Sequence, residues 1–80
     1  MRVKVKLYAT LRRFAPSGTN IGEEFDVKFQ GTMINELIDS LGFPKEQAKI
    51  IMVNGQRVVD LTFRLSENDL VVIFPPIGGG

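Results

Sequence analysis

The last seven residues of the sequence, Phe-Pro-Pro-Ile-Gly-Gly-Gly, end in a carboxylate that could do chemistry. Because glycine has no Cβ, the three glycines could enter a slot too narrow for any side chain. Pro75 and Pro76 can neither donate to a sheet nor continue a helix, which predicts an extended path beyond Phe74. Six extended residues span roughly 20 Å. We therefore expect an arm that presents the Gly80 carboxylate to the active site of another protein.

The rest of the chain offers few groups that could catalyse a reaction. It contains no cysteine, which excludes disulfides, cysteine-ligated metal sites and a thiol nucleophile. It also contains no histidine, the usual general acid or base and the commonest metal ligand. We therefore expect no autonomous active site, no bound cofactor and no metal. The acidic residues form no oxygen cage of calcium type and are interpreted as solvated charges: Glu23, Glu24, Asp26, Glu67 and Asp69.

Length and composition indicate one small globular domain. The chain has 80 residues, of which 44% are apolar and 24% charged. The net charge of +1 is too close to balance to favour any class of partner. Because no stretch resembles a signal peptide or could span a membrane, we expect a cytoplasmic protein with no membrane partner.

The first half of the chain predicts two strands and a helix. Residues 1–9 alternate between apolar and charged side chains, which is typical of a half-buried strand, and Tyr8 falls on the charged face. Residues 10–15 favour a short helical turn, and residues 23–29 alternate again, as expected of an antiparallel partner strand. Thr32 is a plausible N-cap for a helix that ends before Gly42, with its apolar residues at helical spacing: Met33, Ile34, Leu37, Ile38 and Leu41.

The second half predicts a hairpin and a final strand. Pro44 could begin a short turn through Ala48. Asn54-Gly55 is the strongest hairpin signal in the chain, because a type I′ turn needs positive φ at both central residues; its strands would be residues 50–53 and 56–59. Residues 61–65 alternate as a possible edge extension, and residues 66–69 form a polar turn. The last strand, residues 70–74, is apolar on both faces, which favours a central position.

This order of elements predicts an α+β fold. One amphipathic helix would cover one face of a mixed sheet of four to five strands. A hairpin followed by a crossover helix is consistent with a β-grasp arrangement, in which the last strand lies parallel to the first. We expect the β-grasp domain to comprise residues 1–74 and a flexible extended tail to comprise residues 75–80.

A surface patch is expected at the root of the tail. If Val71 and Ile73 face the helix, Phe74 lies on the opposite face with Tyr8 beside it. Two exposed aromatic side chains are a candidate interface; the alternative is that they pack under a loop. A basic stripe suited to RNA is a further possibility, but we favour a solvated strand face and expect no nucleic-acid partner. The stripe would consist of Arg2, Lys4, Lys6, Arg12 and Arg13.

Four segments resemble the MoaD/ThiS sulfur carriers, a family of ubiquitin-like proteins, and the resemblance covers the whole chain. The segments are Tyr8-Ala9-Thr10-Leu11-Arg12, Val53-Asn54-Gly55, Asn68-Asp69-Leu70-Val71 and the residues from Phe74 to Gly80. The tail is the most specific of them, and the Tyr-Ala-x-Leu-Arg segment favours the MoaD side. Gly78 departs from the family pattern, in which serine or threonine is more frequent; this leaves the terminal diglycine intact.

The resemblance implies that a ubiquitin-activating-like adenylyltransferase uses ATP to adenylate the Gly80 carboxylate. Sulfur then displaces AMP to give a thiocarboxylate. The rest of the tail would thread the partner's channel, through Pro75, Pro76, Ile77, Gly78 and Gly79. Arg12 and Arg57 match positions that contact partners in the family, and we expect them to bind a partner together with Tyr8 and Phe74 of the surface patch.

The favoured recipient of the sulfur is molybdopterin, with the large subunit of a molybdopterin-synthase-type complex as the second partner. Other carriers of this fold serve thiamine or tRNA thiolation. A ubiquitin-like modifier, which would form an isopeptide bond with a target lysine, and a binding module with an inert tail are the alternatives of other classes. A glycine-rich linker does not explain why two prolines and Ile77 precede the glycines.

Overall fold

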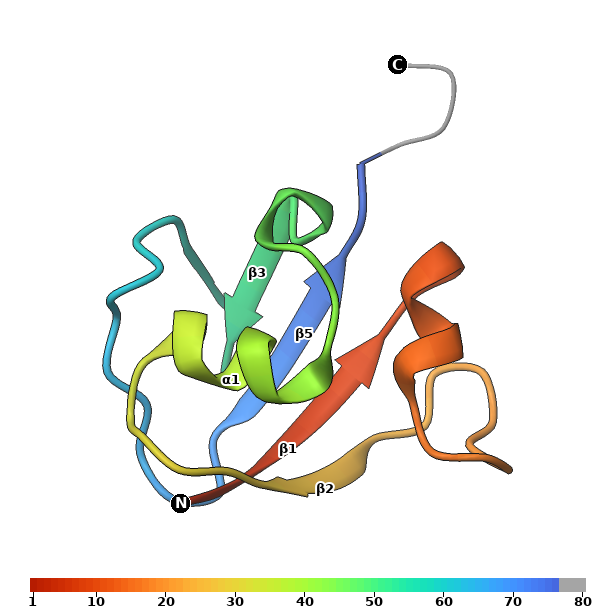
Figure 1. Ribbon diagram of the computed structural model, residues 1–80, viewed down its shortest axis with the longest axis horizontal. Helices are drawn as coiled ribbons and strands as arrows, with labels where there is room; N and C mark the ends of the chain where they lie inside the picture. Colours follow the sequence, from red (N-terminus) through yellow and green to blue (C-terminus); the bar gives the residue numbers. More distant parts are fainter. Residues whose placement is uncertain (77–80) are drawn as a thin grey trace.

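The computed structural model describes residues 1–76 of the chain. Ile77, Gly78, Gly79 and Gly80, which carry the predicted chemistry, lie outside the described residues. The elements are β1 (Arg2–Leu7), the 3₁₀-helix η1 (Ala9–Phe14), β2 (Phe25–Lys28), α1 (Ile34–Leu41), the 3₁₀-helix η2 (Lys45–Gln47), β3 (Ile50–Val53), β4 (Gln56–Val58) and β5 (Leu70–Phe74). Figure 1 shows α1 lying across one face of the sheet.

The five strands form one mixed sheet in the order β2-β1-β5-β3-β4. The last strand, β5, lies in the centre, parallel to β1 and antiparallel to β3. The predicted β-grasp fold and the central position of the last strand are therefore confirmed. In the part of the chain that the structure describes, no helix has the length and apolar character needed to cross a membrane.

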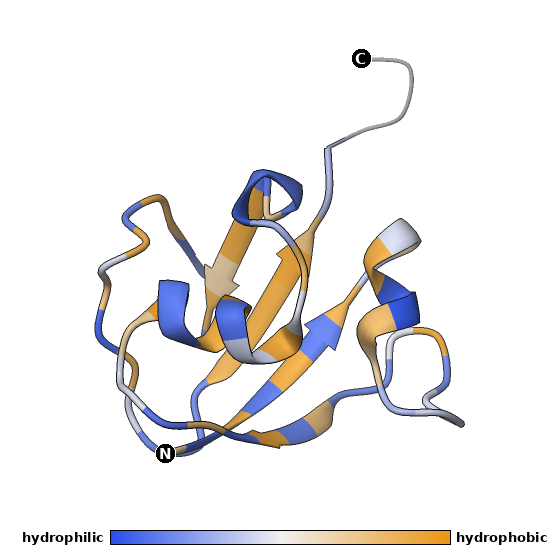
Figure 2. Ribbon diagram, viewed as in Figure 1, coloured by the Kyte–Doolittle hydropathy of each residue, from blue (hydrophilic) through white to orange (hydrophobic). Residues whose placement is uncertain are grey.

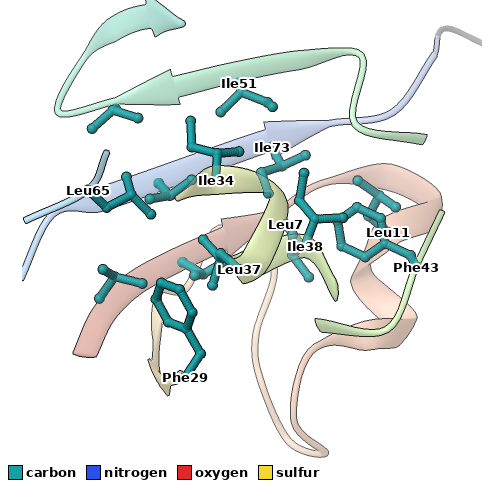
Figure 3. Close-up of a cluster of buried hydrophobic side chains, with 14 residues drawn as sticks. Leu7, Leu11, Phe29, Ile34, Leu37, Ile38, Phe43, Ile51, Leu65 and Ile73 are labelled. Carbon is teal, nitrogen blue, oxygen red and sulfur yellow. The ribbon is translucent and has the colours of Figure 1, made fainter. Parts of the chain in front are cut away.

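The core lies between the sheet and α1 (Figure 3). Ile34, Leu37 and Ile38 lie at helical spacing on one face of α1, and all three are fully buried. They pack against alternate residues of the strands and against residues of the connecting segments. These further core residues are Val3, Val5, Leu7, Leu11, Phe29, Phe43, Ile51, Val53, Leu65, Val71 and Ile73.

The N-terminus of α1 is capped by other residues than the prediction gave. Thr32 is not the N-cap; the helix begins at Ile34, with Met33 as its N-cap residue. The Thr32 hydroxyl instead accepts a hydrogen bond from Arg64 Nη1 at 3.0 Å. The Glu36 carboxylate accepts the backbone N–H groups of Thr32 and Met33 at 2.9 and 3.0 Å. These two hydrogen bonds lower the pKa of Glu36 below its usual value, and the bond from Thr32 has the larger effect.

Residues 61–65 do not form the predicted edge strand. Their only pairing is one isolated bridge, between Met33 and Arg64. The backbone carbonyls of Leu61 and Phe63 instead accept the N–H groups of Asn35 and Ile34, at 2.9 and 3.1 Å. These N–H groups belong to the first turn of α1 and have no partner inside the helix. Residues 61–65 therefore close the helix rather than extend the sheet.

The predicted hairpin is confirmed and is tied to the start of β5. Asn54 and Gly55 have φ angles of 50° and 85°, as a type I′ turn requires. The Asn54 side chain donates to Asp69 Oδ1 at 2.8 Å and accepts the N–H of Leu70 at 2.9 Å. This amide holds the turn against the residue where β5 begins, so the direction of β5 is fixed at its first residue.

Candidate docking face and root of the C-terminal arm

The end of β5 is held from both sides before the chain leaves the sheet. The N–H of Tyr8 donates to the carbonyl of Ile73 at 3.3 Å, and the N–H of Lys49 donates to the carbonyl of Phe74 at 2.9 Å. Pro75 is buried and Pro76 is exposed. Figure 1 shows that the chain leaves the body between η1 and η2. The root of the arm is therefore a fixed point on the molecule.

Tyr8 and Phe74 form an aromatic stack at this root. Their ring centroids are 4.8 Å apart and the rings are inclined by 13°. Both side chains are half-buried, and they lie on the sheet face away from α1 because Leu7 and Ile73, their strand neighbours, point into the core. The predicted contact between them is confirmed, whereas their role in binding a partner stays a prediction.

Apolar side chains continue from this stack across the face of the sheet away from α1. In the ladders, Phe74 is paired with Ile50 and Val72 with Met52. Directly paired residues point to the same side of a sheet. We call this surface the open face, defined by six half-buried residues: Tyr8, Ile50, Met52, Leu70, Val72 and Phe74.

The two predicted arginines lie in different places. Arg57 is paired with Met52, so it lies on the same side of the sheet as the open face, at the edge strand β4. Arg12 is exposed on η1, outside the strands, and it follows Leu11, which is buried in the core. The structure therefore brings Tyr8, Phe74 and Arg57 onto one surface and leaves Arg12 beside it on the element that follows β1.

The sequence interpretation missed Ile50 and Met52 as members of this surface. The signal was present, because residues 50–53 are apolar at every position, as are residues 70–74. A strand of that kind is expected to have strands on both sides. β3 does lie between β5 and β4. Figure 2 shows both β3 and β5 as largely hydrophobic, while β1 alternates.

The acidic residues make local contacts. Glu24 and Asp26 pair with Lys4 Nζ at 3.7 and 3.3 Å. Glu23 accepts the N–H of Asn20 at 2.8 Å, and Asp69 accepts the N–H of Ser66 at 2.8 Å. Within residues 1–76 there is no group of three or more carboxylate, cysteine or histidine side chains that could hold a metal ion.

A mixed sheet with one covering helix, in which the last strand runs parallel to the first at the centre, defines a β-grasp protein of the ubiquitin-like class. Comparison with known proteins gives the family. The sequence profile of the ThiS family matches residues 5–80, so the chain belongs to the ThiS family. A search of curated protein sequences gave no match.

Solved structures with the same fold include SAMP1 from Haloferax volcanii, with a TM-score of 0.67, 21% identity and 100% of both chains covered. Putative molybdopterin converting factor subunit 1 from Pyrococcus furiosus has a TM-score of 0.64 at 27% identity, covering 95% of this chain and 98% of that one. A complex of subunits 1 and 2 of molybdopterin-converting factor from Helicobacter pylori 26695 contains a chain with a TM-score of 0.59, 21% identity and full coverage of both chains.

Proposed function

We propose that this member of the ThiS family carries sulfur on the Gly80 carboxylate and donates it in molybdopterin biosynthesis. The observation that carries the proposal is the root of the arm. The central strand is hydrogen-bonded on both sides up to Phe74, and the chain then leaves through Pro75 and Pro76 beside an apolar face. The remaining residues, Ile-Gly-Gly-Gly, include no side chain that would block a narrow channel except that of Ile77.

The chemistry needs a partner, because a carboxylate is a poor acyl donor. A carboxylate oxygen of Gly80 attacks the α-phosphorus of ATP on the adenylyltransferase, pyrophosphate leaves, and an acyl-adenylate forms. The outer sulfur of a persulfide then attacks the acyl carbon and expels AMP. A second thiol attacks the other sulfur of the resulting acyl disulfide, so that a disulfide leaves and the thiocarboxylate remains. Because ATP and thiols are cytoplasmic reagents, we also propose a cytoplasmic location.

The carrier's own residues bind and orient in this proposal. Tyr8, Phe74 and Arg57 contact the adenylyltransferase and, afterwards, the large subunit of a molybdopterin-synthase-type complex; Arg12 adds a contact from η1. Pro75 and Pro76 restrict the free arm, so less conformational entropy is lost when it enters the partner's channel. The carrier supplies no base and no metal.

A ubiquitin-like protein modifier is the second candidate. The observation that favours it is the similarity to SAMP1, for which a related structure is described as small archaeal modifier protein 1. The activation step is the same, but the acyl carbon is then attacked by the amine of a target lysine. Donation of sulfur to thiamine or to a tRNA base also uses the same activated intermediate, so the recipient is decided after activation.

Adenylation can be tested by ATP–pyrophosphate exchange with the ubiquitin-activating-like enzyme of the same organism. Wild-type protein should support exchange, and Gly79→Val should lower the rate about a hundredfold or more, because a bulky side chain displaces the reacting carboxylate. Ile21→Val is a matched control, since Ile21 is an exposed side chain in the loop before β2. Normal exchange with Gly79→Val, in a protein of unchanged melting temperature, would contradict the proposal.

A further inference from the structure

The strand β2 forms one edge of the sheet, and its outer side carries backbone groups that an added strand could use. The amino group of Met1 donates to the carbonyl of Phe29, and the N–H of Phe29 donates to the carbonyl of Met1, both at 2.9 Å. Hydrogen-bonded and non-hydrogen-bonded pairs alternate along an antiparallel ladder, so the backbone groups of Asp26 and Lys28 point away from β1. No other strand of residues 1–76 lies beyond β2, which Figure 1 shows at the border of the sheet.

The residues of this edge are arranged symmetrically about Val27. Asp26 and Lys28 adjoin Val27 with opposite charges, and Phe25 and Phe29 follow at the next positions outward. Phe25 and Val27 are half-buried and Phe29 is buried, so these three side chains lie on the side of α1. Asp26 and Lys28 are exposed on the opposite side of the sheet. The edge is therefore complementary to a second copy of itself that runs in the opposite direction.

The charges select one register for such a pairing. Placing Asp26 opposite Asp26, or Lys28 opposite Lys28, sets like charges directly across from each other, which is unfavourable. Placing Val27 opposite Val27 brings Asp26 of each copy opposite Lys28 of the other. Both of these pairs then exchange their outward backbone hydrogen bonds. On the side of α1, Phe25 of each copy lies opposite Phe29 of the other.

The charges beside β2 favour the same arrangement. Arg2 is paired directly with Lys28 in the ladder, both are exposed, and neither forms an ion pair within residues 1–76. Like charges directly opposite are destabilising. Asp26 differs because it is paired with Lys4 and lies 3.3 Å from its Nζ. In the paired sheet, Lys28 would gain a carboxylate on the side away from Arg2.

The other edge strand, β4, is not complementary to itself. The turn at Asn54-Gly55 makes its flanking residues, Val53 and Gln56, a hydrogen-bonded pair. Within β4 only Arg57 therefore has backbone groups that point outward, and self-pairing would place Arg57 opposite Arg57. Charged residues on an edge strand ordinarily oppose pairing, as here.

The space beside β2 permits an added strand. On the side of α1, an open hollow of about 610 Å³ adjoins the end of β2. Phe29, Gly31 and Ser40 are among the residues that line it. The hollow leaves room for the side chains that a neighbouring strand would direct toward the helix.

We propose that two copies of the chain associate through β2, antiparallel and with Val27 opposite Val27, so that their sheets become one continuous sheet. The interface is isologous, because both copies use the same surface. It goes beyond the proposed function and does not depend on it. A two-fold axis through this interface reverses the direction of β5, so the two arms leave from opposite ends of the joined sheet. One pair of short strands buries less area than a standard interface, and we expect a Kd of about 100 µM.

Sedimentation equilibrium of two charge variants tests the pairing. Asp26→Lys makes both charges of the edge positive, and Lys28→Asp makes both negative. Each variant alone should have a Kd for self-association raised about tenfold or more at low ionic strength. Mixed in equal amounts, the two variants should associate about as tightly as wild type, since every cross-strand pair again has opposite charges. A variant that merely failed to fold would not be rescued by mixing.

The matched control uses an exposed ion pair outside β2. Lys45 and Asp39 lie 2.7 Å apart, on η2 and α1. Lys45→Asp and Asp39→Lys make the same charge changes and should alter the Kd by less than about threefold, alone or mixed. Wild-type protein that stays monomeric up to about 1 mM would overturn the proposal. So would a mixture of the two β2 variants that associates no better than either alone.

A single cysteine tests the register. The chain contains no cysteine, so the thiol of Val27→Cys has no competitor. Opposed residues of a non-hydrogen-bonded pair have Cα atoms about 4.5 Å apart, within the range that a disulfide spans. Under mild oxidation, Val27→Cys should form a covalent dimer at least about tenfold faster than Val59→Cys. Val59 is the more exposed of the two side chains and lies after β4. Equal rates of crosslinking would overturn the proposed register.

Discussion

Alternate residues of the central strand β5 point to the two faces of the sheet and differ in how deeply they are buried. On the side of α1, Val71 and Ile73 of β5 are fully buried. On the other side, Leu70, Val72 and Phe74 are half-buried. No helix of residues 1–76 covers that second side. A strand that is apolar on both faces, in a sheet with one covered face, leaves its second set of apolar residues for another molecule.

The two faces also differ in how their charges are satisfied. On the covered side, the first turn of α1 is closed by Glu36 and by the carbonyls of Leu61 and Phe63. On the open side, Lys6 and Arg57 have no ion-pair partner among residues 1–76. The first turn of α1 is therefore held by groups within the chain, while the open face has half-buried apolar side chains beside exposed charge.

The largest difference in the free energy of unfolding is expected when a leucine is replaced by alanine on each face in turn. Leu37→Ala removes a fully buried side chain and should lower the free energy of unfolding by about 3 kcal/mol. Leu70→Ala removes a half-buried side chain and should lower it by less than about 1 kcal/mol. Chemical denaturation measures both. Leu70→Ala, and not Leu37→Ala, should weaken binding of the adenylyltransferase, with Leu37→Ala measured where it is fully folded. Equal stability losses would show that the open face is part of the core.

A second comparison uses the two aromatic pairs. Tyr8 stacks on Phe74 on the open face, and Phe14 packs against Phe43 at 5.3 Å beside the covered core. Tyr8→Ala should weaken partner binding about tenfold and should lower the free energy of unfolding by only about 1 kcal/mol, the value of a stacked pair. Phe14→Ala should lower the free energy of unfolding by more than Tyr8→Ala does, and it should leave partner binding unchanged. Titration calorimetry and thermal unfolding of both variants check this, and a Tyr8→Ala variant that is unstable but binds normally would favour simple packing.

The smallest effect on stability is expected from Glu36, at the N-terminus of α1. The pKa of Glu36 is lowered in the folded protein by the N–H groups of Thr32 and Met33. A lowered folded pKa means that the carboxylate stabilises the fold in full above the unfolded pKa, about 4.3. That stabilisation is lost as the pH falls through the folded pKa. Glu36→Gln should therefore show a weaker loss of stability below about pH 4 than wild type. Denaturation curves from pH 7 to pH 3 test this, and identical profiles would contradict it.

The features that could be predicted from the sequence are those set by local pattern. The alternation of β1, the helical spacing of Ile34 and Leu37, and the Asn54-Gly55 turn each depend on a few neighbouring residues. The contact between Tyr8 and Phe74 could also be predicted, because a parallel pairing of β1 with β5 follows from the β-grasp order, and side-chain alternation then assigns both residues to one face.

The features that could not be predicted depend on contacts between distant segments. Residues 61–65 alternate like a strand, but their carbonyls are used by the first turn of α1, about thirty residues earlier in the chain. Thr32 has the right chemistry for an N-cap, but Arg64 uses its hydroxyl. The apolar run of residues 50–53 indicates a strand with a neighbour on each side, but the pairing of Ile50 with Phe74 and of Met52 with Val72 depends on the register of β3 against β5, which no local pattern specifies.

The central claim is that Gly80 carries sulfur. Its most direct test is intact-mass spectrometry of the wild-type protein after incubation with ATP, a persulfide sulfur source and the cognate adenylyltransferase. Gly79→Val serves as the unreactive control. We expect a mass increase that corresponds to replacement of one oxygen by sulfur, assigned to the C-terminal peptide by fragmentation. Conjugates to lysine side chains without this increase would identify a protein modifier, and an unchanged mass with an active enzyme would contradict the claim.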